Sequence, residues 1–161
     1  MTIRVGKFEK ISIGQFDKDV KNPKITYNEL PLPVRATKGS AGYDIKTLFD
    51  IDLQPGEDIK VPTGLKCKID NGWGLFALPK SGLGFKYYTR LANTVGLIDE
   101  DYYNNKDNEG HMWVKLRNEG KEPLHIDAGK GICQVVFLPY GITYDDEAEG
   151  IREGGFGSTN S

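Results

Sequence analysis

The stretch Gly64-Leu65-Lys66-Cys67-Lys68-Ile69-Asp70-Asn71-Gly72-Trp73-Gly74-Leu75-Phe76-Ala77-Leu78 is the most informative about the fold class. Two short strand-like runs, 64–69 and 74–78, flank the dipeptide Asn71-Gly72. Asn-Gly between apolar runs is typical of a tight hairpin turn, because both residues tolerate a positive φ. We therefore expect the second run to return as the partner strand of the first.

The same rhythm of short strand and turn continues on both sides of this stretch. Turn signals occur at Pro55-Gly56, Asn118-Glu119-Gly120 and Asp127-Ala128-Gly129-Lys130-Gly131. They separate strand-like runs at 59–62, 112–116, 124–126 and 132–138, and the last is long and apolar enough for a buried strand. Only 85–91 could hold about two helical turns. This spacing predicts an all-β, jelly-roll-like barrel and not a βαβ fold.

Composition sets the broad class of the protein. A chain of 161 residues fits one domain, and 21 basic against 23 acidic side chains give a net charge of −2. Neither a nucleic-acid groove nor a membrane surface is indicated, and no apolar run could span a bilayer. Cys67 and Cys133 form no C-x-x-C pair, so we expect reduced, buried thiols and a cytoplasmic protein, in host cytoplasm if phage-encoded. His111 and His125 lack nearby partner ligands, so zinc is not expected.

We divide the chain into three parts within this single domain. Residues 1–24 are an N-terminal elaboration, 25–150 form the β domain, and 151–161 form a mobile glycine-rich tail.

Two further stretches carry chemistry. Gly96-Leu97-Ile98-Asp99-Glu100-Asp101-Tyr102 is an apolar run that ends in a carboxylate, with an aromatic ring three residues later. We expect both polar groups at the tip of a hairpin, where a ligand can reach them. The tail Arg152-Glu153-Gly154-Gly155-Phe156-Gly157-Ser158-Thr159 combines glycines with a cation and hydroxyls, which suits phosphate binding. Together they favour hydrolysis of a nucleotide.

Five stretches follow one another between residue 25 and the C-terminus. They are Ala41-Gly42-Tyr43-Asp44-Ile45, Pro79-Lys80-Ser81-Gly82-Leu83-Gly84-Phe85-Lys86, Gly96-Leu97-Ile98-Asp99-Glu100-Asp101-Tyr102, Gly129-Lys130-Gly131-Ile132-Cys133-Gln134 and Gly154-Gly155-Phe156-Gly157-Ser158-Thr159. In this order they resemble the five motifs of the homotrimeric dUTP diphosphatases (dUTPases). Five motifs in a fixed order are much more specific than any one of them.

The resemblance implies an activity and an assembly. The reaction would be hydrolysis of dUTP to dUMP and diphosphate with Mg²⁺, which supplies dUMP for thymidylate synthesis and limits uracil in DNA. Each active site would be shared within a homotrimer, and the tail of one subunit would close over the nucleotide of a neighbour.

The resemblance also assigns roles in the third motif. Asp99 resembles the general base that activates water for attack on the α-phosphorus, although an exposed turn Asp is the simpler alternative. Tyr102 resembles the ring under the deoxyribose, where it leaves no room for a 2′-hydroxyl; it could also be a core aromatic. Uracil would be read by Asn93 and by the hairpin backbone. The remaining substrate-binding residues here are Gly96, Leu97, Ile98, Met112 and Trp113.

Phosphate contacts are implied for the other motifs. Asp44 would lie near Mg²⁺ and act through water, or cap a turn. Phe156 would stack on the uracil. Arg152 lies four residues before Phe156, whereas many relatives have five, and Gly131 stands where the fourth motif often carries Arg. The predicted phosphate-binding residues are Lys80, Ser81, Gly82, Gln134, Arg152, Ser158 and Thr159, and Gly157 is a further predicted substrate-binding residue.

One departure is an insert after Tyr102, the segment Asn104-Asn105-Lys106-Asp107-Asn108-Glu109. It is polar, so we expect it to contact solvent or a regulatory protein partner and to be dispensable for hydrolysis. Two alternative functions remain open. A dCTP deaminase, or a bifunctional deaminase–diphosphatase, shares the fold but relies on a glutamate base. A regulatory binding protein would use the nucleotide-dependent tail to control a partner.

Overall fold

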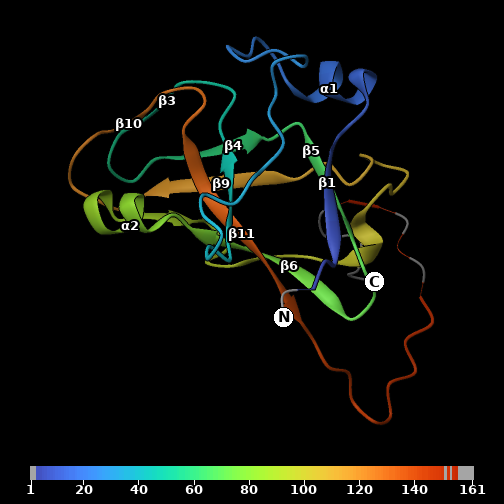
Figure 1. Cartoon of the computed structure of the whole chain (residues 1–161). Coiled ribbons are helices and arrows are strands. Elements are labelled where there is room, and N and C mark those ends of the chain that lie inside the picture. Colours follow the sequence, from blue (N-terminus) through green and yellow to red (C-terminus); the bar gives the residue numbers. More distant parts are fainter. Residues whose placement is uncertain (1–2, 151, 153, 156–161) are drawn as a thin grey trace.

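The computed structural model describes residues 3–150, 152, 154 and 155. The described chain is built from short antiparallel strands, which confirms the predicted all-β, jelly-roll-like class. Figure 1 shows β11 crossing the centre of the molecule. The sheets are β1 (Gly6–Lys10) with β5 (Leu65–Ile69); β3 (Ile51–Leu53) with β10 (Leu124–Ile126); β2 (Tyr43–Lys46), β11 (Gly131–Pro139), β6 (Trp73–Pro79) and β8 (Gly96–Ile98); and β4 (Asp58–Pro62), β9 (Trp113–Asn118) and β7 (Thr89–Leu91).

The hairpin predicted at Asn71-Gly72 is wrong in its pairing. The turn itself forms, because Gly72 has φ 82° and the Trp73 N–H donates to the Asp70 carbonyl at 3.2 Å. The strands that it joins lie in different sheets, however: β5 pairs with β1, whereas β6 lies between β11 and β8. A turn dipeptide fixes only the local reversal, and here strands from distant parts of the sequence occupy the edges that a hairpin would have used.

The helices are short and differ from the sequence prediction. The α1 helix (Ile13–Asp19) was not predicted; it begins where the Ser12 hydroxyl accepts a hydrogen bond from the Gln15 N–H. The α2 helix (Ser81–Tyr87) starts earlier than the predicted 85–91 and ends at Tyr88, which has φ 54°. Residues after it form β7. A single helical turn of 3₁₀ type, η1 (Glu100–Tyr102), follows β8.

A single core joins the N-terminal elements to the rest of the domain. Phe8, Ile11, Phe16 and Val20 are buried in the same apolar cluster as the central strands. Cys67 and Cys133 are buried free thiols, as predicted. Burial raises the pKa of each thiol to about 12. Residues 140–150 are exposed, and they contain no helix or strand (Figure 1).

The expectation that the 104–109 segment meets only solvent or a partner is wrong. Asn105 is 7% exposed, and its amide oxygen accepts hydrogen bonds from the N–H groups of Asp107 and Asn108. The segment has no apolar side chain, but asparagine amides satisfy its backbone and allow it to pack. In the described part of the chain, no helix is long and apolar enough to cross a membrane.

Candidate active site

A pocket of about 320 Å³ lies between β9 and the segment 91–98, which runs from the end of β7 through β8. Its walls are largely apolar and include Ala77 and Leu91, and the ammonium of Lys60 lies 4.4 Å from the ring centroid of Trp113. A small apolar cleft with a few polar groups suits a nucleobase better than an extended polymer. The predicted substrate-binding residues that line it are Asn93, Gly96, Leu97, Ile98 and Trp113.

Gly96 of the third motif has no side chain, so its main-chain atoms line this pocket. A Cβ added to Gly96 would lie 3.1 Å from the Ala77 Cβ, which is a tight contact, and 3.6 Å from the Asn93 amide nitrogen, which is an ordinary one. Among the described strands, β8 pairs only with β6. Its other edge presents N–H and C=O groups in a fixed row. Such groups can read the hydrogen-bonding edge of a planar base.

Asp99 follows β8 directly, at the end of the pocket-lining run. One oxygen of its half-exposed carboxylate lies 2.9 Å from Nη2 of Arg152. Nε of Arg152 lies 2.9 Å from Asp101, and the guanidinium carbon is 5.5 Å from the centroid of the Tyr102 ring. One largely buried cation of the tail therefore contacts three residues of the third motif of its own chain.

Tyr102 is buried in the described structure and held through its hydroxyl. The Tyr102 hydroxyl donates to the His111 carbonyl at 2.8 Å and accepts from the Asn108 amide at 2.9 Å. Burial raises the pKa of the phenol, so it stays protonated at neutral pH. The ring thus has a defined position beside Asp99 and Arg152.

The second and fourth motifs form a separate cluster. Nζ of Lys80 lies 2.7 Å from Asp44, and Gln134 on β11 is the register partner of Asp44 on β2. A Cβ at Gly131 would lie 3.1 Å from the Lys80 ammonium. Any side chain at 131 would therefore meet Lys80. The Lys80 ammonium thus places a positive charge beside Gly131, the position at which the fourth motif often carries Arg. Ser81 and Gly82 begin α2 and are exposed.

These two clusters lie toward opposite ends of β6. Ile98, which precedes Asp99, is opposite Leu75, whereas Lys80 follows the far end of the strand. The five residue steps from Leu75 to Lys80 span roughly 16 Å at about 3.3 Å per residue. Within one chain, the candidate base and the candidate phosphate-binding lysine do not converge on one atom.

Several predicted residues lie elsewhere. Met112 is 4% exposed, belongs to the core, and does not line the pocket. The predicted tail residues outside the described part of the chain are Phe156, Gly157, Ser158 and Thr159. Asp44 is the predicted residue near the metal, and the described residues contain no cluster of three or more metal-type ligands. A single half-exposed carboxylate suits an outer-sphere role toward a cation that phosphate oxygens hold.

A polar network behind Tyr102 was missed at the sequence level. Nε2 of the buried His111 accepts from the Gly64 N–H at 2.9 Å, so Nδ1 carries the proton and donates to Asp19 at 2.6 Å. Burial lowers the pKa of His111, in agreement with a neutral ring. The one available signal was Ser12-x-x-Gln15, a capping-box pattern that predicts the start of α1.

Comparisons with known proteins agree with these motifs. The family model described as dUTPase matches residues 28–160. The deoxyuridine 5′-triphosphate nucleotidohydrolase of Lactococcus lactis is 42% identical over 132 residues, covering 81% of this chain and 88% of that protein. The Haemophilus influenzae protein of the same name is 44% identical over 138 residues, covering 81% and 87%. The crystal structure of dUTPase from Streptococcus mutans superposes with a TM-score of 0.68 at 34% identity, covering 84% of this chain and 97% of that one.

Proposed function

The chain belongs to the dUTPase family and hydrolyses dUTP to dUMP and diphosphate, and from that premise we propose that Asp99 is the general base of the reaction. The observation that carries this assignment is the place of the carboxylate, directly after the strand whose backbone lines the pocket. It is half-exposed, so a water molecule can reach it.

The proposed chemical step is the attack of water on the α-phosphorus of dUTP. Asp99 accepts a proton from the attacking water, and the new oxygen bond forms at the α-phosphorus. The bond from that phosphorus to the bridging oxygen breaks, and diphosphate leaves with the electron pair. Arg152 now pairs with Asp99 at 2.9 Å, and this ion pair occupies a carboxylate oxygen that the attacking water would need. We therefore propose that Arg152 exchanges Asp99 for phosphate oxygens when dUTP binds.

Recognition of the nucleoside falls to the pocket. Asn93 and the edge backbone of β8 would contact uracil, with Trp113 on the facing wall. A base with reversed donors and acceptors would leave these groups unpaired, and that penalty is larger than the gain from a matched contact. Tyr102 would meet the sugar and exclude a 2′-hydroxyl.

The phosphates fall to the second cluster. Lys80, Ser81, Gly82 and Gln134 would bind the triphosphate. The family uses Mg²⁺, which supplies charge neutralisation for the departing phosphates when it is bound. Asp44 would act through water molecules of that ion, and its present partner Lys80 would then turn toward phosphate.

The separation of the clusters supports the proposal that sites are shared in a homotrimer. A base and a phosphate loop at opposite ends of one strand can serve one nucleotide if they come from different subunits. Large apolar side chains near both clusters are exposed: Phe85 is 89% exposed, Tyr88 66% and Leu97 57%. Burial of these side chains at a subunit contact would favour the assembly, in proportion to the apolar area removed from water.

Subunit mixing tests this arrangement. One chain carries Asp99→Asn, and the other carries Lys80→Ala with Gln134→Ala; the two are unfolded together, refolded and assayed at low dUTP. If each site takes its base and its phosphate loop from different chains, about a quarter of the sites regain both sets. The expected rate is then well above the sum of the two variants alone. A mixture no more active than that sum would place each site within one chain.

Three finer assignments are proposed with this function. The 151–161 tail, including Phe156, would close over a neighbouring site, while residues 1–24 and 25–150 would fold as one domain. A cytoplasmic location is compatible with the free thiols of Cys67 and Cys133. A regulatory protein partner at the 104–109 segment would contact its exposed residues, such as Lys106.

Diphosphate release from dUTP, UTP and the other deoxynucleotides would measure substrate choice. Ammonia release from dCTP is the readout of the deaminase alternative, and none is expected.

A further inference from the structure

The 104–109 segment is wound into a compact loop by left-handed residues at its base. Asn104 has φ 57°, Glu109 has φ 59°, and Gly110 has φ 81°. The Asn104 N–H donates to the Glu109 carbonyl at 3.0 Å, which closes the loop. The side-chain amide of Asn105 donates to the Tyr102 carbonyl at 2.8 Å. Asn105, near the start of the loop, therefore ties it to Tyr102, the last residue of the third motif.

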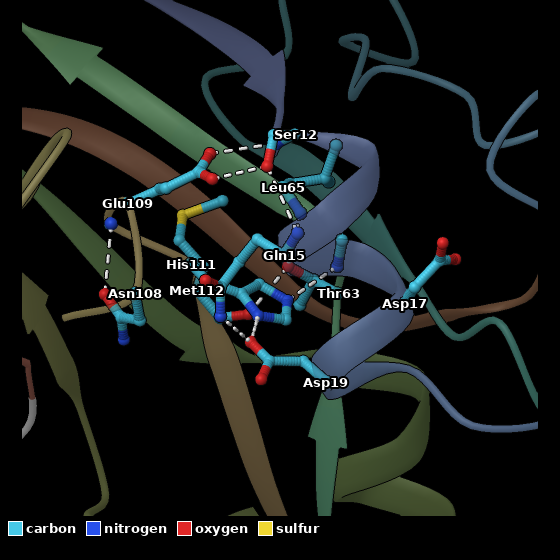
Figure 2. Close-up of polar contacts among 12 residues, drawn as sticks. Ser12, Gln15, Asp17, Asp19, Thr63, Leu65, Asn108, Glu109, His111 and Met112 are labelled. Carbon is cyan, nitrogen blue, oxygen red and sulfur yellow. Dashed lines mark hydrogen bonds and ion pairs between the residues drawn. The ribbon is translucent and has the colours of Figure 1, made fainter. Parts of the chain in front are cut away.

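The loop is also anchored from behind by the N-terminal elements. The Glu109 carboxylate accepts from both the backbone N–H and the hydroxyl of Ser12, at 2.9 and 2.5 Å, where α1 begins (Figure 2). Figure 2 also shows His111, just beyond the loop, directed at Asp19 at the end of α1. Both anchors come from residues that precede the range 28–160 matched by the family model. The loop and α1 thus form one unit, which we call the brace (residues 12–19 and 104–111).

Within the brace, Asn108 is the residue whose side chain reaches the Tyr102 hydroxyl. Its amide nitrogen donates to that hydroxyl at 2.9 Å, while its oxygen accepts from the Asn105 amide at 2.8 Å and the Gly110 N–H at 3.0 Å. The hydroxyl uses its own proton on the His111 carbonyl. The Tyr102 hydroxyl therefore donates one hydrogen bond and accepts another, and two residues of the brace, His111 and Asn108, hold this end of the ring.

We propose that Asn108 is a positioning residue for sugar selection, which acts by holding the Tyr102 ring against the 2′ position of the nucleotide. The inference rests on the proposed role of Tyr102. A steric wall discriminates hydrogen from hydroxyl only if it cannot retreat by about 1 Å, and misplacement on that scale is enough to change rates by about 10²-fold. Apolar packing alone leaves a ring freer to slide than two directed hydrogen bonds.

The experiment compares kcat/KM for dUTP and UTP in Asn108→Ala, Tyr102→Phe and the double variant. Tyr102→Phe removes only the hydroxyl and leaves the loop intact, so it tests the contact even if Asn108→Ala folds poorly. Each single variant is expected to raise the UTP-to-dUTP ratio by about tenfold, on the scale of one lost hydrogen bond. The double variant is expected to match Tyr102→Phe, because that change already removes the hydroxyl to which Asn108 donates. Lys106→Ala is the control, since Lys106 is exposed in the same loop.

The outcomes separate this inference from the function on which it rests. Tyr102→Ala is measured in parallel. If it relaxes the ratio while Asn108→Ala and Tyr102→Phe leave it at the parent value, Tyr102 selects the sugar without help from Asn108, and the inference is overturned. An unchanged ratio in Tyr102→Ala would instead remove the proposed role of Tyr102 itself. Additive effects in the double variant would also contradict a shared contact.

Discussion

The two ends of β6 carry the two clusters of candidate site residues, and they are built in different ways. At one end, Asp99 and Tyr102 lie three residues apart in one motif and share the cation of Arg152. At the other, Lys80, Asp44 and Gln134 come from three distant segments that strand register brings together. The first end follows from local sequence, whereas the second depends on the whole sheet. The groups also differ in chemistry: the first end offers a carboxylate that can take a proton from water, and the second a cation and an amide that can bind phosphate, so we expect the chemical step at the first end and binding at the second.

The largest effect is expected at the base end. Asp99→Asn should lower kcat by a factor on the order of 10² or more and leave KM within a few-fold, because the amide cannot accept the proton of water. Steady-state kinetics with dUTP would measure both parameters.

Asp101→Asn is the matched control, since Asp101 pairs with the same guanidinium. An equal loss of kcat in Asp101→Asn would assign the effect to the Arg152 ion pair and not to a general base.

Removal of the tail from Gly154 onward should abolish most activity while fold and trimer remain. Gly155 is the last described residue of the tail, and a Cβ there would lie 2.9 Å from Asp107 and 3.1 Å from Asn108. From Gly154 onward the tail sequence has one large apolar residue, Phe156, so we expect it to add little to the core and to act by covering the nucleotide and excluding water from the phosphates. Light scattering checks the trimer against the 17.9 kDa subunit. Full kcat/KM in the truncated protein would contradict this role.

A smaller effect, mainly on KM, is expected at the phosphate end. Lys80→Ala should raise KM for dUTP by about tenfold, because it removes a charged hydrogen-bond donor and leaves Asp44 unpaired beside the phosphates. Lys80→Arg keeps the charge and should recover most of the affinity, although the planar fork is not equivalent to an ammonium. A loss confined to kcat would break the proposed division between the two ends.

The sequence was informative where function depends on local spacing. Strand positions such as 124–126 and the pocket-lining run 96–98 were predictable from alternation and from the motif. The pairing of β5 with β1 was not, because a turn dipeptide carries no information about which distant strand reaches an edge. The brace was missed for a related reason. The 104–109 loop is held by hydrogen bonds of asparagine side chains, which leave no periodic hydrophobic pattern in the sequence. From its polar composition, the loop was therefore expected to contact solvent.

The smallest expected effect concerns the brace behind the base end, and it depends on pH. The folded chain holds His111 neutral, with its pKa below the usual 6.5 because of burial; Asp19, Lys60 and Glu109 are the charged groups that act on it. The unfolded chain binds a proton below pH 6.5 and the folded chain does not. This contribution is therefore complete above pH 6.5 and is lost as pH falls below that value. Burial would raise the pKa of Asp19, but hydrogen bonds from Gln15 and His111 outweigh it and lower the pKa below 3.8. The stability that the Asp19 carboxylate contributes is therefore lost only as pH falls below about 3.8.

Between pH 7 and pH 5, the melting temperature of the parent should therefore fall, and the fall should be shallower in His111→Gln. His125 is the matched control, because it is exposed between Asp52 and Asp127, whose hydrogen bonds raise its pKa. Its contribution has the opposite sign: it is present below pH 6.5 and is lost as pH rises through the folded pKa. His125→Gln should then steepen the fall. Hydrogen exchange, corrected for intrinsic rates, should speed up at pH 5 in α1 more than in β11, because α1 ends at Asp19, the partner of His111. Equal acceleration in both elements would mean that acid weakens the fold as a whole and that His111 does not act locally.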